Sequence, residues 1–440
     1  MLFWVLLILS ISLIPFSYLL YIGPDSFGLE DADPVTKEPI VKDNNLRIEV
    51  IAQGLSIPTT MAFLGPDNIL VLEKNNGTVR NIVNGVLVPQ PLLDVHVASD
   101  NERGMVGIAI PNKQVGNNST YVFLYYTEAR IQDGEDDCPR PSYCNEWNEP
   151  LGNRLYRYEL VNNKLVNPKL LLNLPLSPGS VHIGGAMTIG PDGYIYLPVG
   201  DMSLPETLVL NSGGRFPING SGGILRIPQN GSLIKTSPIL NNSYPLNLYY
   251  AYGIRNSFGI DFDPITGKLW DTENGPGFGD EINLVEPGFN SGWKIVQGVW
   301  IARDYLGGEM TLEEPNSLVT FNGRGKYSFP EFTWSRAVAP TAIKFFESNK
   351  FGKEYENDLF VATLIPNGDI YHFDLSNNRT ELSLNRSLGD GIVNSLEEAE
   401  PVIFGKQFGG ISDLEVGPDG NLYVLSFAQG KLYRISPEKS

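Results

Sequence analysis

His182 and Asp201 are the residues whose types and spacing first suggest chemistry. His182 opens the segment HIGGAMTIGPDG, and Asp201 follows the next extended segment. A carboxylate that holds one imidazole nitrogen leaves the other as a proton acceptor, which is the arrangement of a general base. The two glycines after His182 leave room around its ring. A packed structural histidine is the alternative. Of the other two histidines, we interpret His96 as structural and His372 as a packed or surface side chain.

Residues 252–293 combine an Arg-Asn pair, a glycine-rich loop and several carboxylates. An apolar strand, a DPITG turn and a second extended segment precede the loop ENGPGFGDE. Glycine lets backbone carbonyls approach a ligand closely, and carbonyl and carboxylate oxygens suit a hard cation such as Ca²⁺. The loop therefore predicts a calcium site, with an ordinary hairpin and a solvated acidic loop as the alternative.

The composition excludes some classes of protein. The chain has 440 residues, 42% of them hydrophobic, and a formal charge of −18. The apolar content suffices for a folded core, whereas the acidic balance argues against a nucleic-acid partner. The 46 glycines and 32 prolines indicate many turns, as in an all-β fold.

Residues 2–21 form an uncharged apolar run long enough to span a bilayer as a helix. No basic segment precedes it and no small-x-small cleavage site follows. We therefore predict an uncleaved membrane anchor over residues 1–22, with a cleaved signal peptide as the alternative. Residues 23–45 are acidic and contain proline, which is typical of a linker.

Two further features suggest an oxidising compartment outside the cell. Cys138 and Cys144, the only cysteines, lie close together in an acidic insert, so they predict a disulfide rather than a metal site. Eight Asn-x-Ser/Thr triplets suit a glycosylated protein; they begin at Asn76, Asn117, Asn118, Asn219, Asn230, Asn241, Asn378 and Asn385. We expect the main domain to face outward from the membrane, or else to be secreted.

One hairpin pattern recurs between residues 46 and 438. An apolar segment, a turn rich in Pro, Asp and Gly, and a second apolar segment begin near residues 62, 187, 260 and 414. Looser copies pair residues 121–126 with 154–158, and 358–363 with 370–373. Asp and Gly supply the turn geometry, so each copy predicts a β-hairpin. Such repeats, without a long amphipathic helix, predict a six-bladed β-propeller of four-stranded antiparallel blades.

The chain resembles the soluble quinoprotein glucose/sorbosone dehydrogenase family. The segments HIGGAMTIGPDGYIYLPVGD, YGIRNSFGIDFDP and ENGPGFGDEINLVEPGFNSGW carry the resemblance, which runs across nearly the whole domain. It implies a six-bladed propeller that oxidises a sugar with pyrroloquinoline quinone (PQQ) and calcium. It also implies that His182 takes the hydroxyl proton, that Asp201 orients His182, and that Arg255 and Asn256 bind the cofactor. Glu102 matches a glutamine of the family's cofactor site.

The resemblance also assigns the metals. It implies that the carbonyls of Gly275 and Pro276 hold the calcium that polarises the quinone, and that Glu281 helps to bind a second, structural calcium. Calcium acts there as a Lewis acid, while the hydride chemistry belongs to the cofactor.

Several cations of the family pattern are absent. The family's lysine falls near residues 365–366, and two arginines fall near Gly410 and Ser412, where this chain has no basic residue. Ala186 replaces another arginine. Losing two arginine contacts removes about 3–6 kcal/mol of binding to an anionic cofactor. Three basic residues on nearby loops are candidates to compensate: Lys406, Arg336 and Arg103.

Three functions remain after this comparison. The first is a PQQ- and calcium-dependent dehydrogenase acting on a sugar or related polyol, with an unidentified electron acceptor. The second is a cell-surface propeller that binds a glycan or protein and has lost PQQ. The third is a metal-dependent lactone hydrolase, which the Arg-Asn and His-x-Gly-Gly motifs fit less well.

Overall fold

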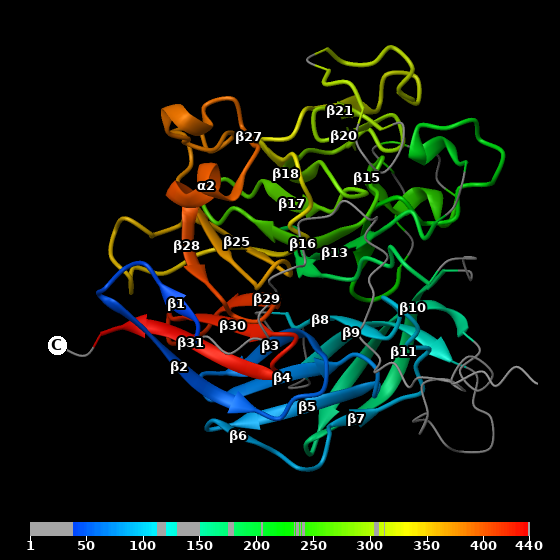
Figure 1. Ribbon diagram of the computed structural model, residues 1–440. Coiled ribbons are helices and arrows are strands. Elements are labelled where there is room, and N and C mark those ends of the chain that lie inside the picture. The colour runs from blue at the N-terminus through cyan, green and yellow to red at the C-terminus, as the bar shows by residue number, and fades with distance from the viewer. Residues whose placement is uncertain are drawn as a thin grey trace, which may run out of the picture.

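The protein is an all-β propeller. The computed structural model describes residues 38–111, 120–129, 150–174, 180–203, 206–232, 234, 237, 239, 243–302, 308–311 and 313–438. Sheets arranged about a common centre make up most of this part (Figure 1). Its helices are single short turns: α2 (Leu396–Ala399), η2 (Leu208–Leu210), η3 (Leu246–Leu248), η4 (Arg386–Leu388) and η5 (Glu400–Val402). The propeller predicted from the repeats is confirmed.

The described strands form six sheets of four or more strands and one of two strands. The sheet of β3 contains β3 (Pro58–Gly65), β4 (Asn68–Glu73), β5 (Thr78–Val83), β6 (Val86–Leu87) and β7 (Leu93–Asp94). The next contains β8 (Met105–Ala109), β9 (Thr120–Ala129), β10 (Pro150–Val161) and β11 (Lys164–Leu174). The sheet of β12 contains β12 (Thr188–Ile189), β13 (Tyr194–Val199), β14 (Gly223–Pro228), β15 (Tyr249–Tyr252), β19 (Phe289–Asn290) and β22 (Lys326–Tyr327).

The remaining sheets follow in chain order. One contains β16 (Ser257–Phe262), β17 (Leu269–Glu273), β18 (Asp280–Val285), β23 (Phe332–Trp334) and β27 (Ile392–Val393). Another contains β24 (Pro340–Phe345), β25 (Leu359–Thr363), β26 (Ile370–Phe373), β28 (Ile403–Lys406) and β1 (Ile40–Val41). The last large sheet contains β29 (Ile411–Val416), β30 (Leu422–Ser426), β31 (Lys431–Pro437) and β2 (Leu46–Gln53). β20 (Val296–Gln297) and β21 (Trp300–Ile301) pair only with each other.

The prediction of six regular four-stranded blades is not met as stated. Only two of the described sheets have four strands; three have five, one has six, and a seventh sheet has two. The added strands come from distant segments, since β27 joins β23, and β1, within the stretch predicted as a linker, joins β28. The sequence repeats mark only local hairpins, whereas these outer strands are recruited by tertiary contact.

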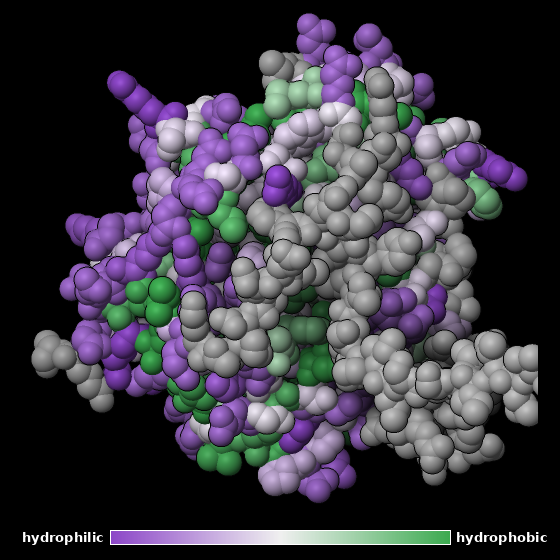
Figure 2. Space-filling view, in the orientation of Figure 1, coloured by the Kyte–Doolittle hydropathy of each residue, from purple (hydrophilic) through white to green (hydrophobic). Residues whose placement is uncertain are grey.

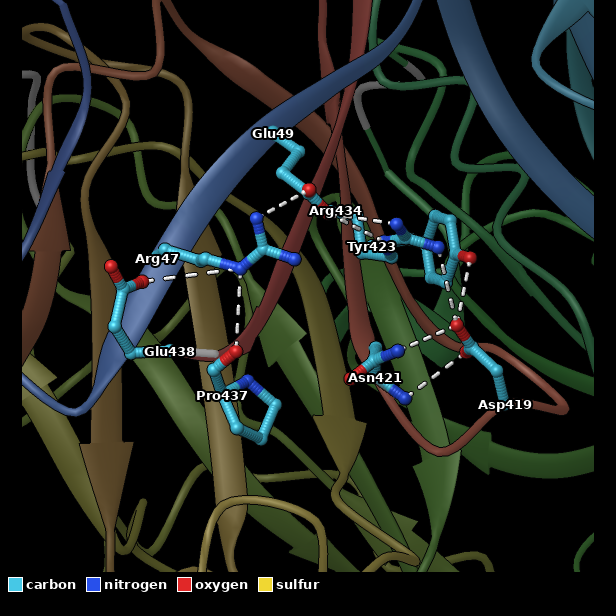
Figure 3. A network of polar contacts seen from close by, with 8 residues as sticks. All are labelled: Arg47, Glu49, Asp419, Asn421, Tyr423, Arg434, Pro437 and Glu438. Carbon is cyan, nitrogen blue, oxygen red and sulfur yellow. Dashed lines mark hydrogen bonds and ion pairs between the residues drawn. The ribbon is translucent and has the colours of Figure 1, made fainter. Parts of the chain in front are cut away.

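A strand from each end of the described chain closes the ring. β2 pairs antiparallel with β31, from Leu46 opposite Pro437 to Gln53 opposite Lys431. On this sheet Glu49 lies 2.7 Å from both Arg47 and Arg434, so it ties the two strands together (Figure 3). This pairing joins the two ends of the described chain in one sheet, with β2 as its outermost strand.

The repeated hairpins form where their turn residues predicted them. Asp192 accepts a hydrogen bond from the Tyr194 N–H, and Asp419 accepts one from the Asn421 N–H, each at 3.1 Å. Gly193 and Gly420 take positive φ, which their lack of a Cβ permits. The second strands β13 and β30 are almost wholly buried because neighbouring sheets cover both of their faces.

An ion-pair cluster joins three neighbouring first strands. Lys344 of β24 lies 3.6 Å from Asp261 of β16 and 3.0 Å from Glu415 of β29, with 21% of its side chain exposed. Burial alone would lower the pKa of Lys344, but Asp261, Glu415 and Asp413 outweigh it and raise that pKa. We call Lys344, Asp261 and Glu415 the Lys344 cluster.

Figure 2 shows that hydrophilic residues cover much of the outer edge of the face in view.

The predicted membrane anchoring is wrong on the present findings. No helix in the described part of the chain is long and apolar enough to cross a membrane, and α2 has only four residues. Residues 2–21, on which the expectation rested, lie outside the described residues.

Candidate active site

His182 and Asp201 meet at one end of the sheet of β12. His182 precedes β12 and Asp201 follows β13, and since the two strands are antiparallel, both residues lie at the same end. The His182 Nδ1 lies 2.6 Å from Oδ1 of Asp201. No described residue forms a hydrogen bond with Nε2 of His182. The pair expected from the sequence therefore forms, with one ring nitrogen held and the other available.

The glycines around this pair allow close packing of the backbone rather than room for the imidazole ring. A Cβ on Gly184 would lie 2.4 Å from the Pro198 carbonyl oxygen, and one on Gly185 would lie 2.6 Å from the Val106 side chain. A Cβ on Gly200 would lie 2.4 Å from the carbonyl oxygen of His182. Glycine is needed because the segment that carries His182 packs directly on its neighbours.

Asp201 is buried and remains ionised. Burial alone would raise its pKa, but the hydrogen bond and charge of His182, the charge of Arg255 and the Trp293 hydrogen bond together lower it. Its Oδ1 also accepts the Ser203 N–H at 2.8 Å. An ionised carboxylate on Nδ1 favours the tautomer in which Nε2 has a free lone pair.

Glu102 holds the backbone at His182. Its Oε2 accepts the N–H of His182 at 2.7 Å, the N–H of Ile183 at 3.3 Å and the side-chain amide of Asn256 at 3.2 Å. Glu102, which was predicted to contact the cofactor, thus connects the loop after the sheet of β3 to the backbone of His182 and to the side chain of Asn256.

Arg255 and Asn256 lie beside this network. The Asp201 N–H donates to the Arg255 carbonyl at 2.8 Å, and the Arg255 guanidinium donates to the Asn274 carbonyl at 2.8 Å. Burial lowers the pKa of Arg255, although four surrounding carboxylates counteract it; in order of effect these are Asp201, Glu102, Asp280 and Glu273. Asn256 is 3% exposed, and its buried Oδ1 has no hydrogen-bond partner among the described residues, so it has an acceptor to offer a ligand.

The Gly275-Pro276 turn has carbonyl groups suited to a cation. A Cβ on Gly275 would lie 1.8 Å from the Phe278 carbonyl, so only glycine fits. Asp280 fixes the turn because it accepts the Gly275 N–H at 2.8 Å. No described residue donates a hydrogen bond to the carbonyl of Gly275 or Pro276, and free carbonyl oxygens are ligands that calcium prefers. These residues fit the calcium that the sequence predicts.

Glu281 belongs to a separate buried group of carboxylates on β17 and β18. Its two oxygens accept hydrogen bonds from the Gly298 N–H, from Gln297 at 3.0 Å, from Asn283 at 3.1 Å and from Ser291 at 3.2 Å. Glu273 lies opposite Glu281 in the strand pairing. Burial raises the pKa of Glu281 to about 8. The predicted role of Glu281 at a second calcium remains a prediction.

Two of the basic residues proposed to compensate for the missing cations, Lys406 and Arg103, each lie beside a carboxylate. Lys406 binds Glu400 at 2.6 Å at the end of β28, where it is committed to an ion pair. Arg103 is partly buried beside Asp100, and burial lowers its pKa. Lys294 was not anticipated: burial lowers its pKa, and the charges of Asp201 and Arg255 act on it, so it lies near the site.

Trp293 is the other residue that sequence reasoning missed. Its indole N–H donates to Oδ2 of Asp201 at 2.8 Å, and the Arg255 guanidinium carbon lies 5.3 Å from its ring centroid. The only sequence signal was a Gly-Trp pair at the end of the segment 252–293. Cys138 and Cys144 lie outside the described residues, so the disulfide stays a prediction.

Comparison with known proteins agrees with this geometry. The Glucose / Sorbosone dehydrogenase family model matches residues 55–434. The aldose sugar dehydrogenase YliI of Escherichia coli is 25% identical over 395 residues, which cover 89% of this chain and 93% of that protein. Quinoprotein glucose dehydrogenase B of Acinetobacter calcoaceticus is 29% identical over 283 residues, covering 58% of this chain and 54% of that protein.

A solved structure shows the same fold. The PQQ-bound aldose sugar dehydrogenase of Streptomyces coelicolor superposes with a TM-score of 0.61 at 20% identity, covering 91% of this chain and 100% of that chain. Because the family model spans far more than half of the residues, the resemblance seen in the sequence is confirmed. The chain belongs to the glucose/sorbosone dehydrogenase family, whose named members are oxidoreductases.

Proposed function

We propose that this chain oxidises a sugar or related polyol with PQQ and calcium, and that His182 accepts the hydroxyl proton. The observation that carries the proposal is the 2.6 Å contact between His182 Nδ1 and Asp201 Oδ1. It holds the imidazole in one orientation and leaves Nε2 without a protein partner among the described residues. That is the state a general base needs before it meets a hydroxyl group.

The chain's own residues divide the remaining work. Asp201 stays ionised, so it stabilises the imidazolium that forms when His182 takes the proton. Arg255 offers a guanidinium to an anionic cofactor, and the carbonyls of Gly275 and Pro276 offer oxygen ligands to calcium. When bound, PQQ supplies the acceptor for the hydride, and calcium polarises its quinone carbonyl.

The electrostatics predict weak retention of the cofactor. Four carboxylates act on Arg255, and the positions near Gly410 and Ser412 carry no basic side chain. A cofactor with several carboxylates therefore meets fewer cations here than the family pattern provides. We expect the purified protein to need added PQQ and Ca²⁺, with uptake that is sensitive to salt.

The test is reconstitution of the full chain. PQQ and Ca²⁺ are added, the absorption spectrum of PQQ is followed, and dye reduction is measured with a panel of aldoses and polyols. His182→Ala is expected to retain PQQ uptake and lose turnover. His372→Ala is the matched control, since His372 binds Asp358 at 3.0 Å in the sheet of β24. Absence of stoichiometric uptake at micromolar PQQ would contradict the proposal, and binding of a glycan without PQQ uptake would favour a binding propeller.

A further inference from the structure

Asp201 is held at both of its carboxylate oxygens. Oδ1 lies 2.6 Å from His182 Nδ1 and accepts the Ser203 N–H, while Oδ2 accepts the indole N–H of Trp293 at 2.8 Å. The carboxylate is 2% exposed, so water cannot readily replace a lost donor. The Trp293 bond therefore fixes the carboxylate plane and, with it, the oxygen that faces the imidazole.

The backbone of Trp293 is itself fixed. Its N–H donates to the Gly253 carbonyl at 3.1 Å, and its carbonyl accepts the Asn211 side-chain amide at 2.9 Å. Asn211 and Asn290 exchange two side-chain hydrogen bonds of 2.8 Å each, and both are buried. The indole thus projects from a backbone held by a buried amide pair, which is the support a positioning group requires.

The same indole reaches the second charged residue of the site. The guanidinium carbon of Arg255 lies 5.3 Å from the ring centroid, within the range of a cation–π contact. One side chain therefore touches the partner of the base with its N–H and the cofactor-side arginine with its ring face. Replacing Trp by Phe removes the N–H donor and retains a smaller aromatic ring at this position.

We propose that Trp293 is a positioning residue that holds Asp201 in the orientation His182 needs to act as a base. This inference rests on the proposed function, because it concerns the same proton transfer. Without the indole N–H, Oδ2 is a buried acceptor without its donor, and the carboxylate is free to turn away from Nδ1. Loss of one hydrogen bond to a charged group corresponds to a fall in kcat of about tenfold to a hundredfold.

The test compares Trp293→Phe with Trp270→Phe in the full chain. Trp270 is fully buried, and its indole N–H has no hydrogen-bond partner, so its replacement removes an N–H that serves no described residue. Trp293→Phe is expected to lower kcat while PQQ uptake changes little. The acid limb of its pH profile is expected to move to lower pH, because a carboxylate turned away from Nδ1 stabilises the imidazolium less. Trp270→Phe is expected to lower the melting temperature while kcat per folded molecule is kept. Equal kcat and pH profiles for Trp293→Phe and wild type would overturn the inference.

Two measurements keep the inference separate from the proposed function. The first is the ¹H and ¹⁵N spectrum of His182 in the cofactor-free protein, which is assignable because the chain has three histidines. The proton shared between His182 and Asp201 is expected to exchange faster in Trp293→Phe than in wild type. In Trp270→Phe its exchange rate is expected to be unchanged. If wild type takes up no PQQ but this difference appears, the proposed function fails and the positioning role stands. The second is Trp293→Phe in an Asp201→Asn background, where additive losses in kcat would overturn a role exerted through Asp201.

Discussion

Asp271 provides a sharp test of how this propeller buries charge. Its side chain is fully buried on β17, and neither of its oxygens has a hydrogen-bond partner within the described residues. Burial raises the pKa of Asp271 to about 7, and the nearby Asn283 and Ser257 side chains offset this only in part. The folded protein therefore holds this proton more tightly than the unfolded chain does.

The sign and size of the effect follow from linkage. Stability from the protonated carboxyl is fully present below the ordinary pKa of 3.8 and is lost as the pH rises through about 7. A shift of one pKa unit corresponds to about 1.4 kcal/mol, so ionisation of Asp271 removes roughly 2–3 kcal/mol between pH 5 and pH 8. Asp271→Asn keeps the size of the side chain and removes the ionisation. Relative to wild type, the variant is expected to gain that amount of stability over the same pH interval.

The assay is urea unfolding at pH 5, 6.5 and 8 in buffer with EDTA, so that calcium binding does not contribute. Asp67→Asn is the control, because Asp67 is an exposed turn residue. The control is expected to show the pH dependence of wild type. If Asp271→Asn also keeps the wild-type slope, burial of Asp271 does not set the pH dependence, and the reasoning fails.

Three further substitutions test other parts of the structure. Lys344→Met leaves the two acids of the Lys344 cluster without their cation and is expected to cost about 2 kcal/mol of unfolding free energy; a loss below about 0.5 kcal/mol in urea titrations would contradict this. Glu102→Gln keeps an oxygen that accepts from the three N–H donors but removes a negative charge that acts on Arg255. PQQ is therefore expected to bind about three- to tenfold more tightly in a spectroscopic titration, and weaker binding would refute this electrostatic explanation. Arg434→Met removes the closure contact with Glu49, and because both groups are partly solvated we expect a loss of only about 0.5–1 kcal/mol; a loss of several kcal/mol would show that the closure depends on this pair.

Much of the fold and part of the site could be predicted because they depend on local chemistry. The Pro-Asp-Gly turns at 190–193 and 417–420 shape the chain through their own side-chain and backbone bonds, so they specify hairpins before any tertiary contact forms. His182 and Asp201 flank one hairpin, and antiparallel pairing alone brings them to the same end.

The outer strands could not be predicted in this way. β1, β19, β22 and β27 are two residues long each, and they pair with strands distant in the chain. Segments this short show no alternation of polar and apolar residues. The sequence pattern therefore could not reveal these strands, and the prediction of four strands in each blade left them out.

The contacts that support the base also depended on tertiary structure, because they join residues far apart in the chain. Glu102 reaches the His182 N–H across 80 positions of sequence, and Trp293 reaches Asp201 across 92. Burial of Asp271 depends on the neighbouring sheets and leaves no mark in the sequence. By itself, the sequence determined the hairpins, the family and the candidate base. Only packing between sheets decided which carboxylates are buried, which donors hold Asp201, and how many carboxylates surround Arg255, because those contacts join residues that the chain keeps far apart.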